Sequence, residues 1–354
     1  MTNTEFQSNE ELRLAKYIAE TTDELSYEVW ISSVSNIPSL IVAEGFEERA
    51  LGLIEKLAKT GVTVPHAILG RYVKNPELND VYKRRFELAL QKIAPNSWEV
   101  VDNHNDGKWV RNCLAKLDGN SVLLDITALS NRGLFEAIDA LVDCEERQIF
   151  LGYSEAQQYW PKRTVWDKLK KHLAENASLS DIVDKEPWLF GYEHCVELVP
   201  GHEGYDSAGR GRALIGFLPF KRARLAAILG EWEYEDLLFI AGRPRLTGNR
   251  WRLEALKEIN GPLIKSWRVE EMSTFGYRDA LRQFVQILFA DESFLRKYDV
   301  HLAILGSKLQ NIACWATSRI LPSLTVVTSV PQRYYPQAFS EGIGTSWVIN
   351  LRRP

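Results

Sequence analysis

The feature that most constrains this chain is an internal repeat, in which four landmarks occur in the same order in each half. The first is an apolar strand that turns into a helix, LIVAEGFEERALGLIEKL from Leu40 and ALIGFLPFKRARLAAIL from Ala213. The second is a strand ending in Gly-Arg, HAILGRY and LLFIAGRP. The third pair is SVLLDITALSNRGLFEAI and VHLAILGSKLQNIACWA, and the fourth is YSEAQQYWP and TSVPQRYYP. Four matches in one order indicate a duplicated unit.

The landmarks also predict the fold class, because each half reads as β-α-β-α-β-α-β. Apolar runs such as SVLLDI and LTVVTSV are typical of parallel strands covered on both faces. Strands that alternate with helices predict a doubly wound sheet, so we expect an α/β fold of two tandem Rossmann-like halves, each with a mainly parallel sheet, from an internal duplication. The expected domains are an accessory N-terminal helix at 1–38, a first half at 39–161, a helical and glycine-rich linker at 162–212, and a second half at 213–354.

Composition is that of an ordinary globular protein. Of the 354 residues 45% are apolar and 25% are charged, and the net charge of −4 gives no overall attraction to nucleic acid or to an anionic membrane. No run approaches the roughly 20 apolar residues of a membrane-spanning helix, and the polar N-terminus lacks the apolar core of a secretory signal. We therefore expect a cytoplasmic protein without membrane contact, while a local basic patch stays open.

The cysteines and histidines predict neither disulfide bonds nor a metal site. Cys113, Cys144, Cys195 and Cys314 lie far apart and form no CxxC pair, and the six histidines form no HExxH motif. We expect reduced thiols, no metal and no cofactor, although a site built mainly from Asp and Glu stays open.

Ligands of a doubly wound sheet bind outside the carboxyl ends of its strands, where nearly all the landmarks lie. Helix N-termini and arginine forks hold phosphates, tyrosine stacks on bases, and glutamine hydrogen-bonds base edges. The predicted ligand-binding residues of the first half are Gly45, Arg49, Gly70, Arg71, Thr127, Ser130, Arg132, Gln157 and Tyr159. Those of the second half are Gly242, Arg243, Gly306, Ser307, Lys308, Gln310, Gln332, Arg333 and Tyr334. We expect Arg71, Arg132, Arg243, Lys308 and Arg333 to neutralise phosphates, Tyr159 and Tyr334 to stack on bases, and the two edges to form one composite pocket if they face each other.

Structural roles explain several of these residues as well. The run from Asp125 to Arg132 also suits a helix cap with a solvated arginine, and a Gly-Arg pair also suits a turn followed by a surface side chain. The Tyr-aromatic-Pro elements also suit packing at a strand edge. The Gly201–Arg212 loop is either a flap over a nucleotide or, more in keeping with its composition, a linker.

Four acidic residues at strand ends of the first half are candidate catalytic groups: Glu44, Glu47, Glu48 and Asp125. A carboxylate there can act as a general base or bind a ribose hydroxyl. The matching segment of the second half, Leu218–Arg222, contains no acid, and basic or small residues such as Lys221, Arg222, Gly306 and Lys308 occupy the other strand ends. The two halves are therefore related but not equivalent.

Two basic segments with tryptophans, KRTVWDKLKK and NRWRLEALK, suggest a path for RNA or DNA. Because the whole chain is acidic, nucleic acid is a less favoured partner than a small molecule.

The segments LLDITALSNR and AILGSKLQ resemble the nucleotide-sensing CARF domains of prokaryotic defence systems, and the SAVED domains that look like two fused CARF units. The resemblance implies that strand-end loops of two such units hold a cyclic oligonucleotide. The usual Gly-Gly-Thr-Lys is Ala128-Leu129-Ser130-Asn131 here, and the second half has Gly-Ser-Lys without a preceding Asp-x-Thr. No appended nuclease motif is recognisable in the sequence.

Three functions fit these observations. The favoured one is a binding or sensor protein for a nucleotide-like, phosphate-bearing ligand in antiviral defence or signalling, which acts through a partner protein. The second is an enzyme that acts on a nucleotide or an N-glycosidic bond with a strand-end carboxylate. The third is a structural subunit of a defence complex.

Overall fold

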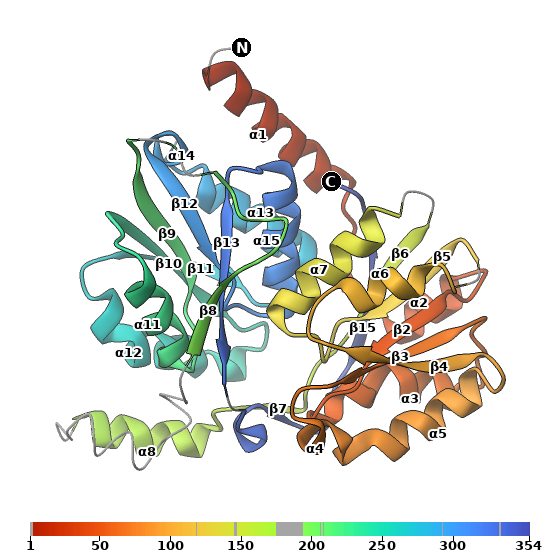
Figure 1. Cartoon of the computed structure of the whole chain (residues 1–354). Helices are drawn as coiled ribbons and strands as arrows, with labels where there is room; N and C mark the ends of the chain where they lie inside the picture. The colour runs from red at the N-terminus through yellow and green to blue at the C-terminus, as the bar shows by residue number, and fades with distance from the viewer. Residues whose placement is uncertain are drawn as a thin grey trace. The chain divides into compact units, whose positions relative to one another are not determined.

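The computed structural model describes residues 3–354 apart from 118, 145–146, 175–193, 206, 208, 292 and 333. The chain divides into two compact units (Figure 1). The first-half unit comprises Thr22–Trp160 and Pro336–Arg353, and the second-half unit comprises Met1–Thr21, Pro161–Tyr335 and Pro354.

The first-half unit is built on a seven-stranded sheet in the order β1-β15-β6-β5-β2-β3-β4. Strands β2 to β6 are parallel to one another, β15 pairs antiparallel with β6, and β1 pairs antiparallel with β15. The strands are β1 (Leu25–Ser26), β2 (Ser39–Ala43), β3 (Ala67–Tyr72), β4 (Trp98–Asn103), β5 (Ser121–Asp125), β6 (Gln148–Ser154) and β15 (Ser346–Leu351). A separate two-stranded sheet pairs β7 (Gln158–Tyr159) with β14 (Ser340–Glu341).

The second-half unit repeats this topology in a six-stranded sheet of order β11-β10-β9-β12-β13-β8. Strands β9 to β13 are parallel, and β8 pairs antiparallel with β13. The strands are β8 (His194–Leu198), β9 (Gly211–Phe217), β10 (Asp236–Arg243), β11 (Arg268–Ser273), β12 (Tyr298–Ala303) and β13 (Thr325–Pro331). In both units the parallel strands follow the Rossmann order 3-2-1-4-5, with an antiparallel strand beside the fifth. The predicted two-half α/β fold is confirmed.

Helices connect the strands of both sheets. Those of the first-half unit are α2 (Tyr27–Ser33), η1 (Glu48–Leu51), α3 (Gly52–Lys59), α4 (Pro76–Asn79), η2 (Asp80–Tyr82), α5 (Lys83–Ile93), α6 (Lys108–Leu114), α7 (Asn131–Val142) and η4 (Pro336–Ala338). Those of the second-half unit are α1 (Asn3–Glu20), α8 (Arg163–Ala174), α11 (Arg222–Glu231), η3 (Thr247–Asn249), α12 (Trp251–Ile264), α13 (Tyr277–Leu288), α14 (Phe294–Lys297) and α15 (Lys308–Ile320). Among the described residues, no helix is long and apolar enough to cross a membrane.

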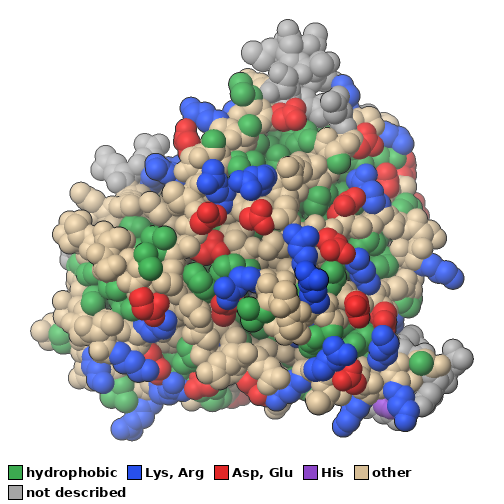
Figure 2. All heavy atoms as spheres, turned by 180° about the vertical axis from the view of Figure 1, so that it is seen from behind, with side chains coloured by type: hydrophobic (Ala, Val, Ile, Leu, Met, Phe, Trp, Pro, Cys, Tyr) green, Lys and Arg blue, Asp and Glu red, His purple; other side chains and the backbone are tan. Residues whose placement is uncertain are grey.

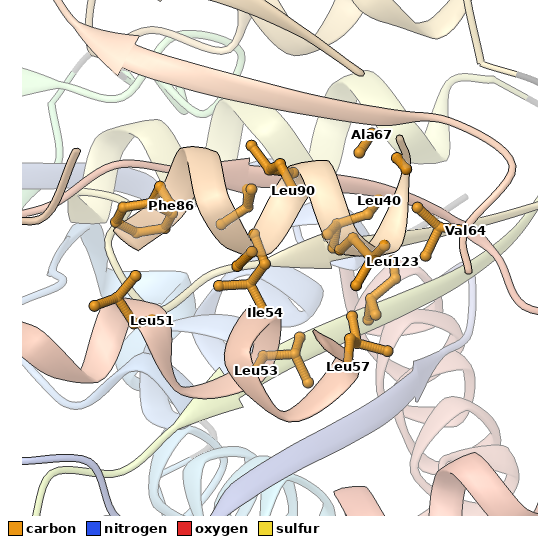
Figure 3. Close-up of a cluster of buried hydrophobic side chains, with 14 of the residues drawn as sticks. Leu40, Leu51, Leu53, Ile54, Leu57, Val64, Ala67, Phe86, Leu90 and Leu123 are labelled. Carbon is orange, nitrogen blue, oxygen red and sulfur yellow. The ribbon is translucent and has the colours of Figure 1, made fainter. Parts of the chain in front are cut away.

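The core of the first-half unit shows why these segments form helices and strands. Apolar side chains of α3 and α5 face each other and the central strands of the sheet (Figure 3). Ile54 and Leu57 of α3 recur at helical spacing and meet Phe86 and Leu90 of α5. All four are at most 1% exposed, so the repeated apolar positions of the first landmark form the core.

The second-half unit has an equally closed core around α13 and α15. Trp315, Tyr277 and Phe284 are fully buried, and the ring of Phe284 stacks on Phe217 of β9. The Tyr17 hydroxyl of α1 lies 2.9 Å from the Tyr277 hydroxyl. This contact ties the N-terminal helix to this unit.

The boundaries of the units differ from the predicted domains. Residues 336–353, expected in the second half, belong to the first-half unit, because β15 pairs with β6 from Ser346–Ser154 to Leu351–Ile149. Of the expected accessory segment 1–38, only 1–21 belongs to the second-half unit. The expected linker 162–212 contains β8, an edge strand of the second sheet.

The predicted strand pattern also missed one parallel strand in each half, namely β4 and β11. Both lie at a sheet edge, and their sequences, WEVVDN and RVEEMS, mix apolar and charged residues. Edge strands keep one side in contact with solvent and are often protected by charges, so they lack the continuous apolar run by which the buried strands were found.

Candidate functional site

Glu44 follows β2 at the carboxyl edge of the first-half sheet and is held in an ion pair with Arg71 of β3. The Arg71 Nε donates to both carboxylate oxygens at 3.0 and 3.2 Å, and its Nη2 donates to Oε1 at 2.9 Å. The Glu44 side chain is 0% exposed, and Arg71 is also 3.3 Å from Glu87. The hydrogen bonds with Glu44 raise the pKa of Arg71. Both predicted residues are present at the edge, but each already holds the other.

Arg49 forms a second ion pair, with Glu47, that is largely shielded from solvent. Its Nε and Nη2 donate to the two carboxylate oxygens at 2.9 and 3.0 Å. The Ser340 hydroxyl donates to the same carboxylate. The side chains of Arg49 and Glu47 are 10% and 15% exposed. Glu47 is therefore engaged as an internal anion for Arg49.

Two tyrosines complete the surroundings of Arg49. Its Nη1 donates to the Tyr153 hydroxyl at 3.3 Å and to the Ser154 carbonyl at 3.4 Å. Its guanidinium lies 5.6 Å from the centre of the Tyr159 ring, and the two tyrosine hydroxyls are 2.9 Å apart. Burial lowers the pKa of Arg49, but Glu47 and the two tyrosines outweigh burial and raise it. Tyr159, predicted to stack on a base, here packs on an arginine.

Asp125 is the last residue of β5, and its carboxyl group is buried. Its Oδ1 accepts from the Thr127 N–H at 2.9 Å, whereas its Oδ2 is enclosed and has no hydrogen-bond partner among the described residues. The Thr127 hydroxyl accepts from the Ser154 N–H at 3.0 Å. Burial raises the pKa of Asp125 to about 6, although the bonds with Thr127 and the charge of Arg49 act against this rise.

The Asp125→Asn variant is expected to remove a pH dependence of stability. The folded pKa of about 6 lies above the ~3.9 of an unfolded Asp, so the folded state keeps a proton that the unfolded state loses. The free energy of unfolding of the wild type should therefore fall by about 2 kcal/mol relative to Asp125→Asn between pH 4.5 and 7.5. Denaturant unfolding of both proteins at several pH values measures the difference. A difference that stays constant with pH would show that the carboxyl group is ionised throughout.

The remaining polar residues of this edge serve the first-half unit itself. Glu48 accepts from Arg85 at 2.8 Å, and Arg132 donates to Glu136 at 2.6 Å. Ser130 caps α7 by accepting from the Gly133 N–H. The arginines predicted to hold phosphates here, Arg71 and Arg132, each have a carboxylate partner.

Packing accounts for three of the predicted glycines. A Cβ on Gly70 would lie 2.7 Å from the Trp109 ring, and one on Gly242 would lie 2.7 Å from the Thr274 methyl group. Gly45 likewise faces Ala128. These positions require glycine because side chains of the protein fill the space beside them.

At the carboxyl ends of the second-half strands, which we call the second-half edge, the third landmark forms a helix cap. Ser307 caps α15 and forms a capping box with Gln310, which is 1% exposed. The Gln310 amide also donates to the Met272 and Ser273 carbonyls at 3.3 and 3.0 Å. Gln310 therefore ties α15 to the end of β11, while Gly306 and Lys308 flank the cap. The predicted corner exists, and its glutamine has a structural role.

Arg224, which sequence reasoning missed, is the unusual residue of the second-half edge. Its Nη2 donates to the Ser329 carbonyl at 2.9 Å, while its Nε is enclosed without a hydrogen-bond partner in the described part of the chain. Within that same part it has no ion pair. Burial lowers its pKa, and Tyr334 acts against this. The Ser329 hydroxyl is also buried without a partner among the described residues.

Other predicted residues of this edge are more exposed or lie outside the described residues. Arg243 and Gln332 are exposed, and Tyr334 is half-buried near Arg224. Arg333 lies outside the described residues. The composite pocket between the two edges stays a prediction.

The two edges differ sharply in charge. The segments after the second-half strands, residues 218–224, 242–252, 273–277, 304–308 and 331–335, contain no Asp or Glu. The first-half edge pairs its arginines with Glu44, Glu47, Glu48 and Glu136. On the face shown in Figure 2, basic and acidic side chains are intermixed, as expected for a net charge of −4. The second-half edge is therefore basic, whereas acidic and basic side chains are intermixed on the face of Figure 2.

An open pocket of about 970 Å³ lies at the opposite end of the second-half sheet, beside the starts of β9, β10 and β12. Its walls include Trp232 and Tyr234, with charges of both signs such as Arg210 and Asp299. Arg210 and Asp299 are 3.9 Å apart. This mixture favours neither an anion nor a cation. Among the described residues, no group of three or more His, Cys, Asp or Glu side chains is arranged to hold a metal ion.

No protein-family model and no curated protein sequence matches the chain. Among solved structures, a universal stress protein from Archaeoglobus fulgidus has 9% identity, covers 82% of this chain and 96% of its own, and has a TM-score of 0.23. The UDP-GlcNAc 2-epimerase of Neisseria meningitidis bound to UDP-GlcNAc has 12% identity, covers 80% and 91%, and has a TM-score of 0.23. Superpositions this poor bear on neither fold nor function.

Proposed function

We propose that the second-half unit binds a phosphate-bearing, nucleotide-like ligand where β9 and β13 end and α11 begins. The observation that carries the proposal is Arg224, whose enclosed Nε has no partner and which pairs with no carboxylate among the described residues. Arg224 is partly exposed, but its Nε is shielded from water, and a cation withdrawn from water is costly unless an anion or a full set of hydrogen bonds compensates it. A phosphate beside Arg224 would supply both.

The first-half unit supports this proposal, because it contains the same arrangement with an anion in place. Arg49 donates to the Ser154 carbonyl, as Arg224 donates to the Ser329 carbonyl, and the two serines occupy matching positions of the fourth landmark. Alignment of Phe46 with Phe220 puts Lys221 at the position of Glu47. In the second half a lysine therefore stands at the position where the first half has its internal carboxylate.

Two side chains near Arg224 favour a nucleotide-like ligand over phosphate alone. Tyr334 lies near Arg224, and exposed Gln332 is on the same segment. These side chains suit a base beside a phosphate. The role as a sensor that acts through a partner protein in defence or signalling is supported only by the resemblance to CARF and SAVED domains.

Isothermal titration calorimetry with inorganic phosphate, AMP, ATP, and linear and cyclic dinucleotides tests the proposal. We expect at least one nucleotide to bind the wild type, and Arg224→Gln to weaken it at least tenfold, which is about 1.4 kcal/mol. Arg224→Lys should retain part of the affinity because it keeps the charge but not the planar fork.

Arg282→Gln is the matched control, since Arg282 is an exposed arginine on α13 of the same unit. It should bind as the wild type does. Arg224→Gln should also change the stability of the ligand-free protein by less than about 1 kcal/mol, because it removes an uncompensated charge. The absence of binding by every nucleotide, or equal binding by Arg224→Gln, would reject the proposal.

A further inference from the structure

The loops after β9 and β10 form a strongly basic surface, which we call the basic edge and define as residues 218–224 and 242–252. The strands are neighbours in the sheet, so their loops lie side by side. The first loop contributes Lys221, Arg222 and Arg224, and the second contributes Arg243, Arg245, Arg250 and Arg252. Neither contains an acid. Arg243 and Arg250 are exposed, and neither forms an ion pair with a described residue.

Aromatic rings are interleaved with these cations. The Arg252 guanidinium lies 4.4 Å from the centre of the Phe220 ring, which joins the two loops of the basic edge. Arg245 lies 4.5 Å from the ring of Phe275, in the loop after β11. Guanidinium planes and aromatic faces are the groups on which unpaired bases stack.

Helix α8 extends the surface. Arg163 of α8 lies 5.4 Å from the Trp251 ring, and Lys170 pairs with Glu258 of α12 at 3.0 Å. Helices α8 and α12 therefore lie beside each other (Figure 1). The two basic, tryptophan-containing segments, KRTVWDKLKK and NRWRLEALK, come together in the second-half unit although they are far apart in sequence.

We propose that the basic edge binds a single-stranded nucleic acid, so that the phosphate beside Arg224 is one of several along a strand. This inference rests on the proposed function and names its ligand class. A surface with several cations and no acids is a better match for a chain of phosphates than for a single mononucleotide. The stacked arginines and aromatic rings favour unpaired bases over a duplex, whose bases are already stacked.

Fluorescence anisotropy with fluorescein-labelled oligo(dT) and oligo(U) of 20 nucleotides tests this inference. If about four phosphates are neutralised, raising KCl from 50 to 200 mM should weaken binding about 50-fold. Arg243→Glu with Arg250→Glu should weaken binding at least tenfold. The matched control is Arg84→Glu with Lys92→Glu on α5, two exposed cations of the first-half unit with the same change of charge, and it should bind almost as the wild type does.

Polyphosphate of equal charge separates a nucleic acid from any polyanion, and we expect it to bind at least tenfold more weakly than oligo(dT). Equal binding of polyphosphate, or equal effects of the two double variants, would overturn the inference. If AMP or ATP binds in an Arg224-dependent way but neither oligonucleotide binds, the strand is excluded and the proposed function stands. If neither kind of ligand binds, both are rejected.

Discussion

Replacing Arg71 with alanine is expected to lower the free energy of unfolding of the first-half unit by about 3–5 kcal/mol. The reason is Glu44, whose side chain is 0% exposed and whose carboxylate accepts three hydrogen bonds from Arg71. Without Arg71 a buried carboxylate would lose its main cation. Because a chain of two units need not unfold in one step, hydrogen exchange of peptides from β2 and β3 during denaturant unfolding measures the effect locally.

Two further variants separate this explanation from a general loss of surface charge. Arg85→Ala breaks ion pairs with Glu48 and Glu55 that are 20–41% exposed, so its cost should be at most about 1 kcal/mol. Replacing both Glu44 and Arg71 with methionine should bring the stability back to within about 1 kcal/mol of the wild type. Equal small effects of Arg71→Ala and Arg85→Ala would show that Glu44 is not an isolated buried charge.

The fold was largely predictable from sequence because the repeat lets the same order of strands and helices be recognised in each half. Strands β2 and β9 are central, buried on both faces and therefore continuously apolar, which made their match visible. The third strands, β4 and β11, lie at sheet edges where charged side chains interrupt the apolar pattern. The pairing of β15 with β6 joins segments almost 200 residues apart, and no local pattern encodes such a partner.

The candidate site was less predictable, because sequence shows which residues lie at a strand end but not which of them pair. Glu44, Glu47 and Arg71 were predicted as functional groups, yet each forms an ion pair within the protein. Arg224 was missed because the alignment puts Ala223, not Arg224, opposite Arg49. The available signal was the absence of acids from residues 218–224, which leaves the arginines of that loop without a carboxylate partner in the same loop.

The similar hydrogen bonds of Arg49 and Arg224 to the carbonyls of matching serines lead to a second large expected effect. Glu47→Ala removes the carboxylate that holds Arg49, whose side chain is only 10% exposed, and should lower the stability of the first-half unit by about 3–5 kcal/mol. It should also leave room for a free anion on the arginine fork. If phosphate then binds with a Kd of about 1 mM, 10 mM phosphate should restore about 1.4 kcal/mol. Hydrogen exchange of peptides from β2 and β6, with and without phosphate, measures both changes.

This experiment is best done with Arg224→Gln present, so that any effect of phosphate arises in the first-half unit. Ser340→Ala is the matched control, since it removes a hydrogen bond to Glu47 but leaves the ion pair intact, and phosphate should not stabilise it. Stabilisation of Glu47→Ala by phosphate would show that the duplicated arrangement is an anion site that Glu47 fills from within the chain. Destabilisation without recovery in phosphate would show that Arg49 needs its own carboxylate, and would remove the first-half support for a phosphate beside Arg224.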